Sequence, residues 1–228
     1  MSIRPQRIFP LSDNAVTVEF GDSISEEFND TAIALADHFT QAPFAGCIES
    51  VPAIVSTTIF YDPLVVRKTA PHRNAYSTVH SFIESALQHL TAGALGQCRS
   101  MIFPVRFGPE YALDLDALAD SRGLSPDTVI EIFLSIEYRV YMLGFLPGFA
   151  YMGQVDERIA APRRATPRTH VPKGGVGIAG RQTGIYPTAS PGGWQIIGNT
   201  PLELITANDK APCLFSAGDR VRFVRSDK

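Results

Sequence analysis

The sequence predicts an α+β protein of two domains: a small α/β sandwich of the ferredoxin-like kind over residues 1–97 and a β-barrel or sandwich over residues 98–228. Strand-like and helix-like patterns alternate through the first hundred residues. From Met101 onward, short apolar runs lie between Gly and Pro turns, and 11 of the 18 glycines fall between Gly144 and Gly198. A chain of 228 residues is also long enough for two small domains with separate cores.

The first domain alternates strand, helix, strand and helix. We expect a strand at Ala15–Phe20, a helix over residues 28–39, a strand at Ile54–Tyr61 and a helix over residues 79–90. The strands alternate apolar and polar residues or are rich in β-branched ones, whereas the helices repeat apolar residues every three or four positions. Ser23 followed by Glu26 predicts a capping box before the first helix.

The second domain opens with a strand in MIFPVRF, from Met101, and continues with a short helix that ends at Gly123. Ser125 and Pro126 then supply a cap and a first-turn proline for another helix. Beyond it, the runs VGIAG, WQIIG, PLELI and RVRFV lie between glycine and proline turns. That pattern is typical of an all-β barrel or sandwich and not of a parallel sheet.

Composition narrows the class of protein. The formal charge is −3, which gives no electrostatic reason to expect nucleic acid as a partner. No apolar run is long enough to span a membrane, and the N-terminus lacks the apolar core of a signal peptide. Cys47, Cys98 and Cys213 are far apart and odd in number, so we expect buried thiols, no metal site and a cytoplasmic location.

The stretch GGVGIAGRQTGIYP contains the spacing G-x-G-x-x-G at Gly175, Gly177 and Gly180. A dinucleotide-binding loop needs a strand before these glycines and a helix after them. Prolines stand on both sides here, at Pro172 and Pro187, so that interpretation is rejected. Neither a P-loop nor a protein-kinase loop fits, because their further motifs are absent.

Charge offers another interpretation of the glycine-rich stretch. No Asp or Glu occurs from Arg158 to Leu202. The cations of this acid-free stretch are Arg158, Arg163, Arg164, Arg168, Lys173 and Arg181. Exposed backbone N–H groups and guanidinium groups that converge in a sheltered cleft would bind an anion. The alternative is that the stretch forms a solvated basic surface whose glycines lie in turns of the barrel. For Trp194 and the aromatic turn at 144–149, the alternative to a ligand-binding role is packing in the core.

Three segments are distinctive enough to indicate a protein family: EYRVYMLGFLPGFAYMG, PRRATPRTHVPKGGVGIAGRQTGIYP and SPGGWQIIGNTPLELI. They closely resemble the family of the 5-oxoprolinase B subunit, also called allophanate hydrolase subunit 1 (carboxyltransferase domain, subdomains C and D), which includes a sporulation-kinase inhibitor. The early segments PLSDNAVTVEFGD and IFYDPL fit the family as well, so the resemblance covers nearly the whole chain. It implies a ferredoxin-like domain followed by a cyclophilin-like β-barrel, without implying prolyl isomerase activity.

The resemblance also implies an activity and partners. The implied enzyme is an ATP-dependent 5-oxoprolinase, a hydrolase that converts 5-oxo-L-proline to L-glutamate with ATP and water, Mg²⁺ accompanying the ATP. The implied partners are the 5-oxoprolinase C subunit, or allophanate hydrolase subunit 2, and a further A subunit, and we expect this chain to be inactive alone. Two other functions stay open: inhibition of a sensor histidine kinase, and a part in allophanate hydrolysis or urea carboxylation.

On this resemblance we assign candidate site residues. The candidate catalytic residues are Lys173, Arg181 and Gln182. The candidate substrate-binding residues are Arg168, Gly175, Gly177, Thr183, Tyr186, Gly192, Gly193, Trp194 and Gln195. Family members usually carry histidine where this chain has Phe133, proline where it has Ala150, and a double glycine where it has Gly108 and Pro109. The histidine position has either a role in proton transfer or a role in packing.

Overall fold

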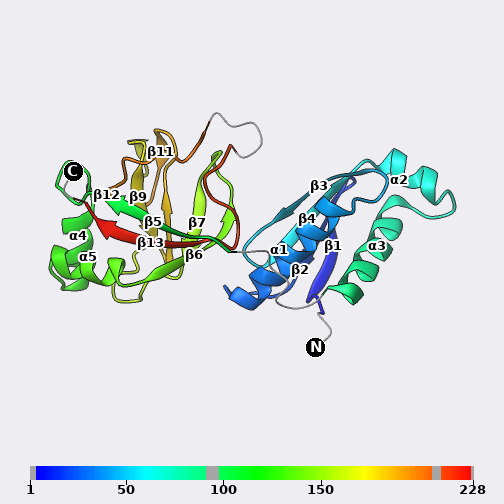
Figure 1. Cartoon of the computed structure of the whole chain (residues 1–228), viewed down its shortest axis with the longest axis horizontal. Helices are drawn as coiled ribbons and strands as arrows, with labels where there is room; N and C mark the ends of the chain where they lie inside the picture. Colours follow the sequence, from blue (N-terminus) through cyan, green and yellow to red (C-terminus); the bar gives the residue numbers. More distant parts are fainter. Residues whose placement is uncertain (1–3, 91–97, 207–211, 227–228) are drawn as a thin grey trace. The chain divides into compact units, whose positions relative to one another are not determined.

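The computed structural model describes residues 4–90, 98–206 and 212–226. The chain divides into two compact units, Met1–Gln97 and Cys98–Lys228, at the position where the sequence pattern changes (Figure 1). Each unit buries apolar residues in a core of its own.

The N-terminal unit contains every element predicted for it and three more. Its elements are β1 (Arg7–Ser12), β2 (Ala15–Glu19), α1 (Glu26–Gln41), β3 (Cys47–Pro52), β4 (Ser56–Tyr61), α2 (Pro63–Thr69) and α3 (Ala75–His89). The strands β1 and β3 and the short helix α2 were not predicted. The predicted capping box is wrong, because the N-cap of α1 is Ser25 and its side chain makes no capping hydrogen bond.

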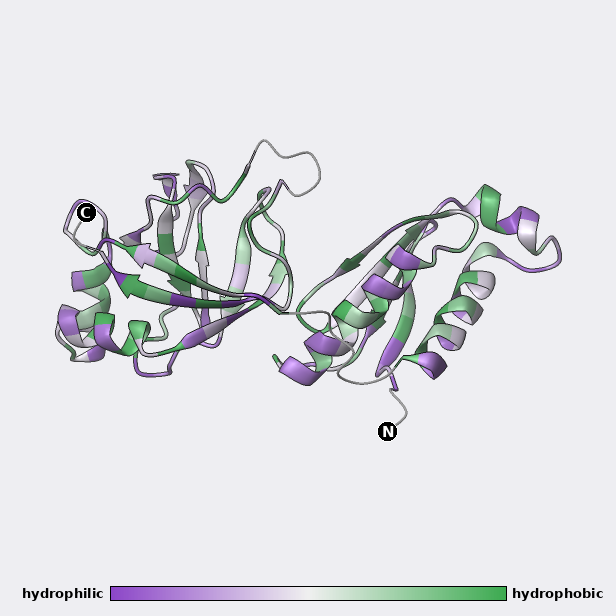
Figure 2. Ribbon diagram, viewed as in Figure 1, coloured by the Kyte–Doolittle hydropathy of each residue, from purple (hydrophilic) through white to green (hydrophobic). Residues whose placement is uncertain are grey.

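The sheet of this unit has the order β1-β2-β4-β3, and every neighbouring pair is antiparallel. The ferredoxin-like prediction is not confirmed. A ferredoxin-like unit alternates as β-α-β-β-α-β, whereas here the strand beside β2 is its own hairpin partner β1, from the N-terminal side. Helices α1 and α3 pack on the sheet, and their apolar stripes bury Leu35, Phe39 and Ile83 against Val18 and Ile59. Figure 2 shows the mixed hydropathy expected of such amphipathic helices.

The C-terminal unit is mostly β-sheet with two short helices. Its elements are β5 (Ser100–Val105), α4 (Leu115–Arg122), α5 (Pro126–Leu134), β6 (Glu137–Leu143), β7 (Ala150–Gly153), β8 (Arg168–Val171), β9 (Gly175–Ala179), β10 (Gln182–Ile185), β11 (Ser190–Gly192), β12 (Gln195–Asn199) and β13 (Arg220–Arg225). The predicted helix stop at Gly123 is confirmed, since this residue is a left-handed C-cap. So is the cap at Ser125, whose Oγ accepts the Thr128 N–H at 3.2 Å.

The main sheet of this unit curls into a mixed half-barrel. Its order is β12-β9-β10-β7-β6-β13-β5, in which β5 and β13 are parallel and the other neighbours antiparallel. The curl brings the two edge strands together, because Arg106, just after β5, and Asn199, at the end of β12, exchange backbone hydrogen bonds of 2.8 and 3.0 Å. Helices α4 and α5 pack beside β12 and β13 (Figure 1). The cyclophilin-like description stays a prediction.

The described helices include none with the length and apolar character that crossing a bilayer requires.

Closure of the sheet depends on a glycine. A Cβ on Gly198 would lie 2.6 Å from Val105 Cγ1 and 2.9 Å from the Arg106 carbonyl oxygen. We expect Gly198→Ala to destabilise the protein by about 1–3 kcal/mol, because backbone atoms must move apart to admit the methyl group. Thermal unfolding followed by circular dichroism measures the loss. Gly193→Ala is the matched control, since its Cβ would meet no atom closer than 3.6 Å; equal melting temperatures for the two variants would contradict the account.

Candidate functional site

The carboxylate of Asp114, at the N-cap position of α4, is a buried polar group that accepts four hydrogen bonds. Its side chain is 2% exposed. Arg168 donates from both terminal nitrogens at 2.6 and 2.7 Å, Arg164 donates to the same carboxylate, and the Ile196 backbone N–H donates at 2.7 Å. Such a buried carboxylate is stable only when its acceptor sites are filled in this way. Arg168, a candidate substrate-binding residue, is therefore bound to Asp114.

The glycines of the G-x-G-x-x-G stretch serve strand packing. Gly175 and Gly177 are buried in β9, which pairs with β10 on one side and β12 on the other. A Cβ on Gly177 would lie 3.0 Å from the Trp194 Cβ, and the Gly177 carbonyl accepts the buried Thr183 hydroxyl at 2.9 Å. The two glycines thus allow close approach of neighbouring strands. They do not form the exposed backbone cradle that the anion-binding hypothesis requires.

Tyr186 and Trp194 belong to an aromatic wall made of Phe145, Phe149, Tyr151, Tyr186 and Trp194. The ring of Phe149 contacts Tyr186 and Trp194 edge-on, each at 5.3 Å between centroids. Tyr186 and Trp194 are buried, so the packing alternative describes both rings. Phe145 differs, because its side chain is 60% exposed and its φ is +68°, a conformation that costs a non-glycine residue free energy.

The Gly192–Gln195 segment holds the aromatic wall against the preceding loop. A Cβ on Gly192 would lie 2.4 Å from the Tyr186 Oη, so only glycine leaves room for the hydroxyl. Burial raises the pKa of Tyr186, and a hydrogen bond from the Trp194 backbone opposes that shift. The Gly193 carbonyl accepts the Arg164 N–H at 2.7 Å, and Gln195 Nε2 donates to the Pro162 carbonyl at 3.0 Å.

The structure places Lys173 and Arg181 at opposite ends of β9. Lys173 Nζ pairs with Glu203 at 2.6 Å, and Arg181 Nη1 pairs with Glu157 at 2.9 Å. Both cations are about half exposed, at 49% and 48% of the side chain. At about 3.3 Å per residue, the ends of β9 lie roughly 13 Å apart, and the two cations are bound to different carboxylates beyond them. One phosphoryl group could therefore not bind both residues in this arrangement.

Gln182, the third candidate catalytic residue, is used differently. Its side-chain Nε2 is buried and has no hydrogen-bond partner among the described residues. Gln182 opens β10 and pairs with Gly153 and Ala179 across the sheet. A buried amide donor without a partner is costly unless something else accepts its hydrogen bond. Gln182 is thus the candidate catalytic residue whose buried side-chain donor has no partner among the described residues.

Carboxylates neutralise most of the acid-free stretch. Arg158 pairs with Asp156, Arg164 and Arg168 share Asp114, and Lys173 and Arg181 pair with Glu203 and Glu157. Within the parts of the chain that the structure describes, Arg163 is the cation of this stretch without such a pair. The cations do not converge in one hollow. The described residues also contain no group of three or more His, Cys, Asp or Glu that could hold a metal ion.

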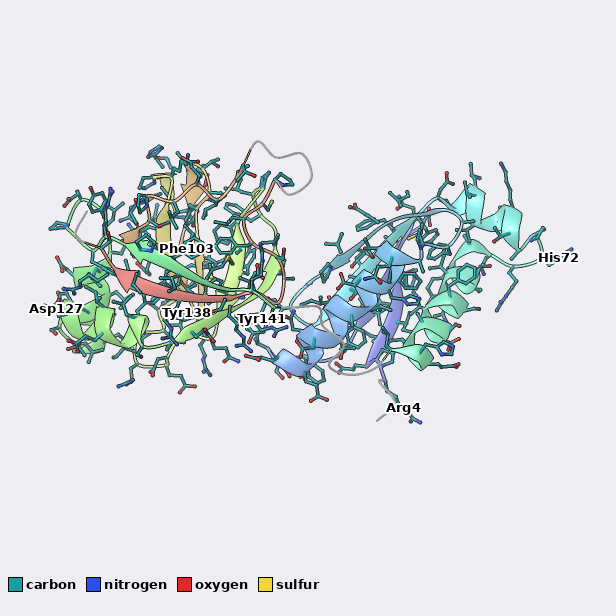
Figure 3. All side chains as sticks on the ribbon, in the orientation of Figure 1. Arg4, His72, Phe103, Asp127, Tyr138 and Tyr141 are labelled. Atoms are coloured by element: carbon teal, nitrogen blue, oxygen red, sulfur yellow. The ribbon has the colours of Figure 1, made fainter. Side chains whose placement is uncertain are left out.

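A cavity that sequence reasoning missed lies at the N-terminal ends of α4 and α5. Its volume is about 520 Å³, within the range of small-molecule sites. We call it the helix-end cavity. Its polar lining includes Arg106, Glu110, Tyr111, Asp116, Asp127 and Arg225. Asp127, in the first turn of α5, is labelled in Figure 3. The signal present in the sequence was Gly108 and Pro109, a departure from the family pattern that lines this cavity.

Comparison with known proteins decides the family. The family model of the carboxyltransferase domain, subdomain C and D, matches residues 6–215. The chain belongs to this family. The B subunit of 5-oxoprolinase from Bacillus subtilis (strain 168) is 43% identical over 227 residues, which cover 99% of this chain and 94% of that protein.

Two solved structures agree with the fold. The crystal structure of TTHA0988 superposes with a TM-score of 0.80 at 34% identity, covering 94% of this chain and 40% of that one. This chain therefore spans only 40% of the length of that solved relative. The Kluyveromyces lactis urea carboxylase has a TM-score of 0.74 at 18% identity, covering 97% of this chain and 23% of that one, and shows the fold alone.

Phe133 occupies a core position in this family member. It is fully buried, stacks on Phe223 at 4.9 Å between centroids and contacts Tyr138 at 5.2 Å. The Tyr138 hydroxyl donates to the Phe133 carbonyl at 2.9 Å. Burial raises the pKa of Tyr138 far above its usual value, so this hydroxyl stays protonated. In this chain the position serves packing, and a proton-transfer role has no group to perform it.

The hydrogen bonds that Asp114 accepts from Arg164, Arg168 and Ile196 predict that loss of its charge destabilises the protein. We expect Asp114→Asn to destabilise the protein by about 3–5 kcal/mol, because two partly buried guanidinium groups lose their shared counter-charge. Chemical denaturation measures the change. Asp120→Asn, an exposed aspartate on the same helix, is the control and should shift stability by less than about 0.5 kcal/mol. Equal stability of the two variants would refute the structural role given to Asp114.

Proposed function

We propose that this protein is the B subunit of an ATP-dependent 5-oxoprolinase. The observation that carries the proposal is the match over 99% of this chain and 94% of the Bacillus subtilis protein of that name. The proposed overall reaction consumes 5-oxo-L-proline, ATP and two waters, and it yields L-glutamate, ADP and phosphate. One water opens the ring and the other accounts for ATP hydrolysis, so the atoms balance.

The chemistry explains why several proteins would cooperate. A five-membered lactam is a poor electrophile, and phosphorylation of its amide oxygen would supply the missing activation. The acid-free stretch does not fit a triphosphate: Gly175 and Gly177 are buried in β9, and all its cations but Arg163 are paired with carboxylates. We therefore assign no step through ATP to these residues. ATP would bind where the C and A subunits complete the assembly, and this chain would hold the organic substrate.

Of the three candidate catalytic residues, we retain only Gln182, as a contact to a partner subunit and not to the substrate. Lys173 and Arg181 each form one exposed ion pair, and such pairs contribute about 0–1 kcal/mol. Gln182 keeps a buried amide donor without a partner among the described residues, and a partner subunit that contacts β10 could accept its hydrogen bond. The substrate-binding candidates around the aromatic wall would act indirectly, by fixing the strand β10 that carries Gln182.

Reconstitution tests the proposed function. We expect ADP and L-glutamate to form in equal amounts when this chain is mixed with the C and A subunits, ATP and 5-oxo-L-proline. Omitting this chain should abolish both products, because neither of the other proteins would hold the lactam. Activity that persists without the chain would contradict the proposal. Inhibition of a histidine kinase by the chain, with no reconstituted activity, would favour the regulatory alternative.

Gln182 provides a sharper test. We expect Gln182→Met to lower kcat/KM of the reconstituted enzyme at least about tenfold, since the amide donor is lost. The same change should leave the melting temperature unchanged or higher, because it removes a buried donor without a partner. Lys173→Ala is the matched control and should retain activity within about threefold. A fully active Gln182→Met enzyme would contradict this role of Gln182.

A further inference from the structure

We infer that the helix-end cavity binds the organic substrate, a small carboxylic acid with an N–H donor next to its carboxylate. The choice of ligand rests on the proposed function, whereas the location rests on the cavity alone. Three features of the cavity support this assignment: an anionic wall, a cationic side and an apolar floor.

The anionic wall presents two carboxylates that can accept hydrogen bonds. Glu110 and Asp116 line the cavity and form no hydrogen bond or ion pair with the described residues. The Glu110 carboxylate lies over the backbone of Gly108, with Oε2 only 2.8 Å from where a Cβ would stand. Carboxylates accept hydrogen bonds and donate none. This wall therefore suits a ligand with an amide N–H or an ammonium group.

The cationic side can receive the ligand's carboxylate. Arg225 pairs with Asp127 at 2.8 Å, but the Asp127 side chain is 77% exposed. An ion pair of this kind contributes about 0–1 kcal/mol, so a ligand carboxylate can take its place. Arg106 lies over the Tyr111 ring, with Cζ 5.3 Å from the centroid, which orients its planar guanidinium. Arg225 is therefore the guanidinium assigned to the ligand's carboxylate, because Arg106 already has partners within the described chain.

The apolar floor lies between these two sides. Ala112, Leu115 and Ile130 line the cavity and are each less than 10% exposed. A short run of methylene groups, as in a lactam ring or a glutamate side chain, would bury apolar area against them. The cavity thus offers acceptors, donors and an apolar surface in one place, as sites for small polar molecules do.

The charge balance also excludes a triphosphate from the helix-end cavity. Its lining carries three carboxylates, those of Glu110, Asp116 and Asp127, against the two guanidinium groups of Arg106 and Arg225. A triphosphate with several negative charges would be repelled far more strongly than a ligand with one carboxylate, which Arg225 can pair. The cavity is therefore assigned to the lactam or amino acid and not to the nucleotide.

Ligand-observed NMR on the purified full chain tests the inference. The probes are 5-oxo-L-proline and L-glutamate, with glutarate lacking the nitrogen and 2-pyrrolidone lacking the carboxylate. We expect at least one of the first two to bind at least about tenfold more tightly than both truncated compounds. Arg225→Gln and Glu110→Gln should each weaken that binding about tenfold. Arg222→Gln, an exposed arginine on the same strand that does not line the cavity, should leave it within about twofold.

Three outcomes would overturn the inference: no binding of either probe up to about 10 mM, equal binding of the truncated compounds, or unchanged binding by both cavity variants. Different results would contradict the proposed function and the cavity assignment. If the reconstituted enzyme is active and the cavity variants bind and react normally, the function stands and the cavity is rejected. If the chain binds a probe through Arg225 and Glu110 but no mixture of the three proteins is active, the cavity stands and the function is rejected.

Discussion

The buried carboxylate of Asp114 ties together three segments that lie far apart in the sequence. Asp114 stands at the N-cap position of α4, and its carboxylate accepts the backbone N–H of Ile196 in β12 and binds the guanidinium groups of Arg164 and Arg168. Because the Asp114 side chain is only 2% exposed, these partners donate the hydrogen bonds that water would donate to an exposed carboxylate. The position of α4 against β12 follows from this one cluster, and so does the shape of the helix-end cavity, whose lining includes Leu115 and Asp116 of α4.

The acid-free stretch shows how charge in the sequence differs from charge in space. Its cations are neutralised by acids that stand just outside it, at Asp156, Glu157 and Glu203, and by the distant Asp114. Most of these pairs are exposed and contribute little to stability, but they fix where the long side chains lie. A stretch without acids is therefore weak evidence for an anion site unless its sequence neighbours are also free of acids.

Local signals predicted the elements that have strong periodicity or clear caps. The β2 and α1 patterns, the left-handed Gly123 and the Ser125 cap all depend on residues within a few positions of one another. The strand β1 was missed because its exposed residues and Pro10 weaken the alternation, and it is held as an edge strand by pairing with β2.

The candidate site was less predictable than these elements, because it depends on contacts between distant residues. Arg168 and Asp114 are 54 positions apart, and nothing near either residue predicts the other. Arg106 and Arg225 of the helix-end cavity lie near the beginning and the end of the C-terminal unit's sequence. The parallel pairing of β5 and β13 brings them together.

The sheet connects the family's glycine-rich strand to the helix-end cavity. Asn199 pairs with Gly175 of β9 on one side and with Arg106 on the other, so β9 lies two strands from the cavity lining. Neighbouring strands are about 4.8 Å apart, so a side chain forced onto β9 displaces β12 and then Arg106. A loss of activity after changing Gly175 or Gly177 would therefore not identify these residues as ligand contacts. Only a change in ligand binding that leaves the stability of the sheet intact distinguishes a residue that touches the substrate from one that holds the sheet in place.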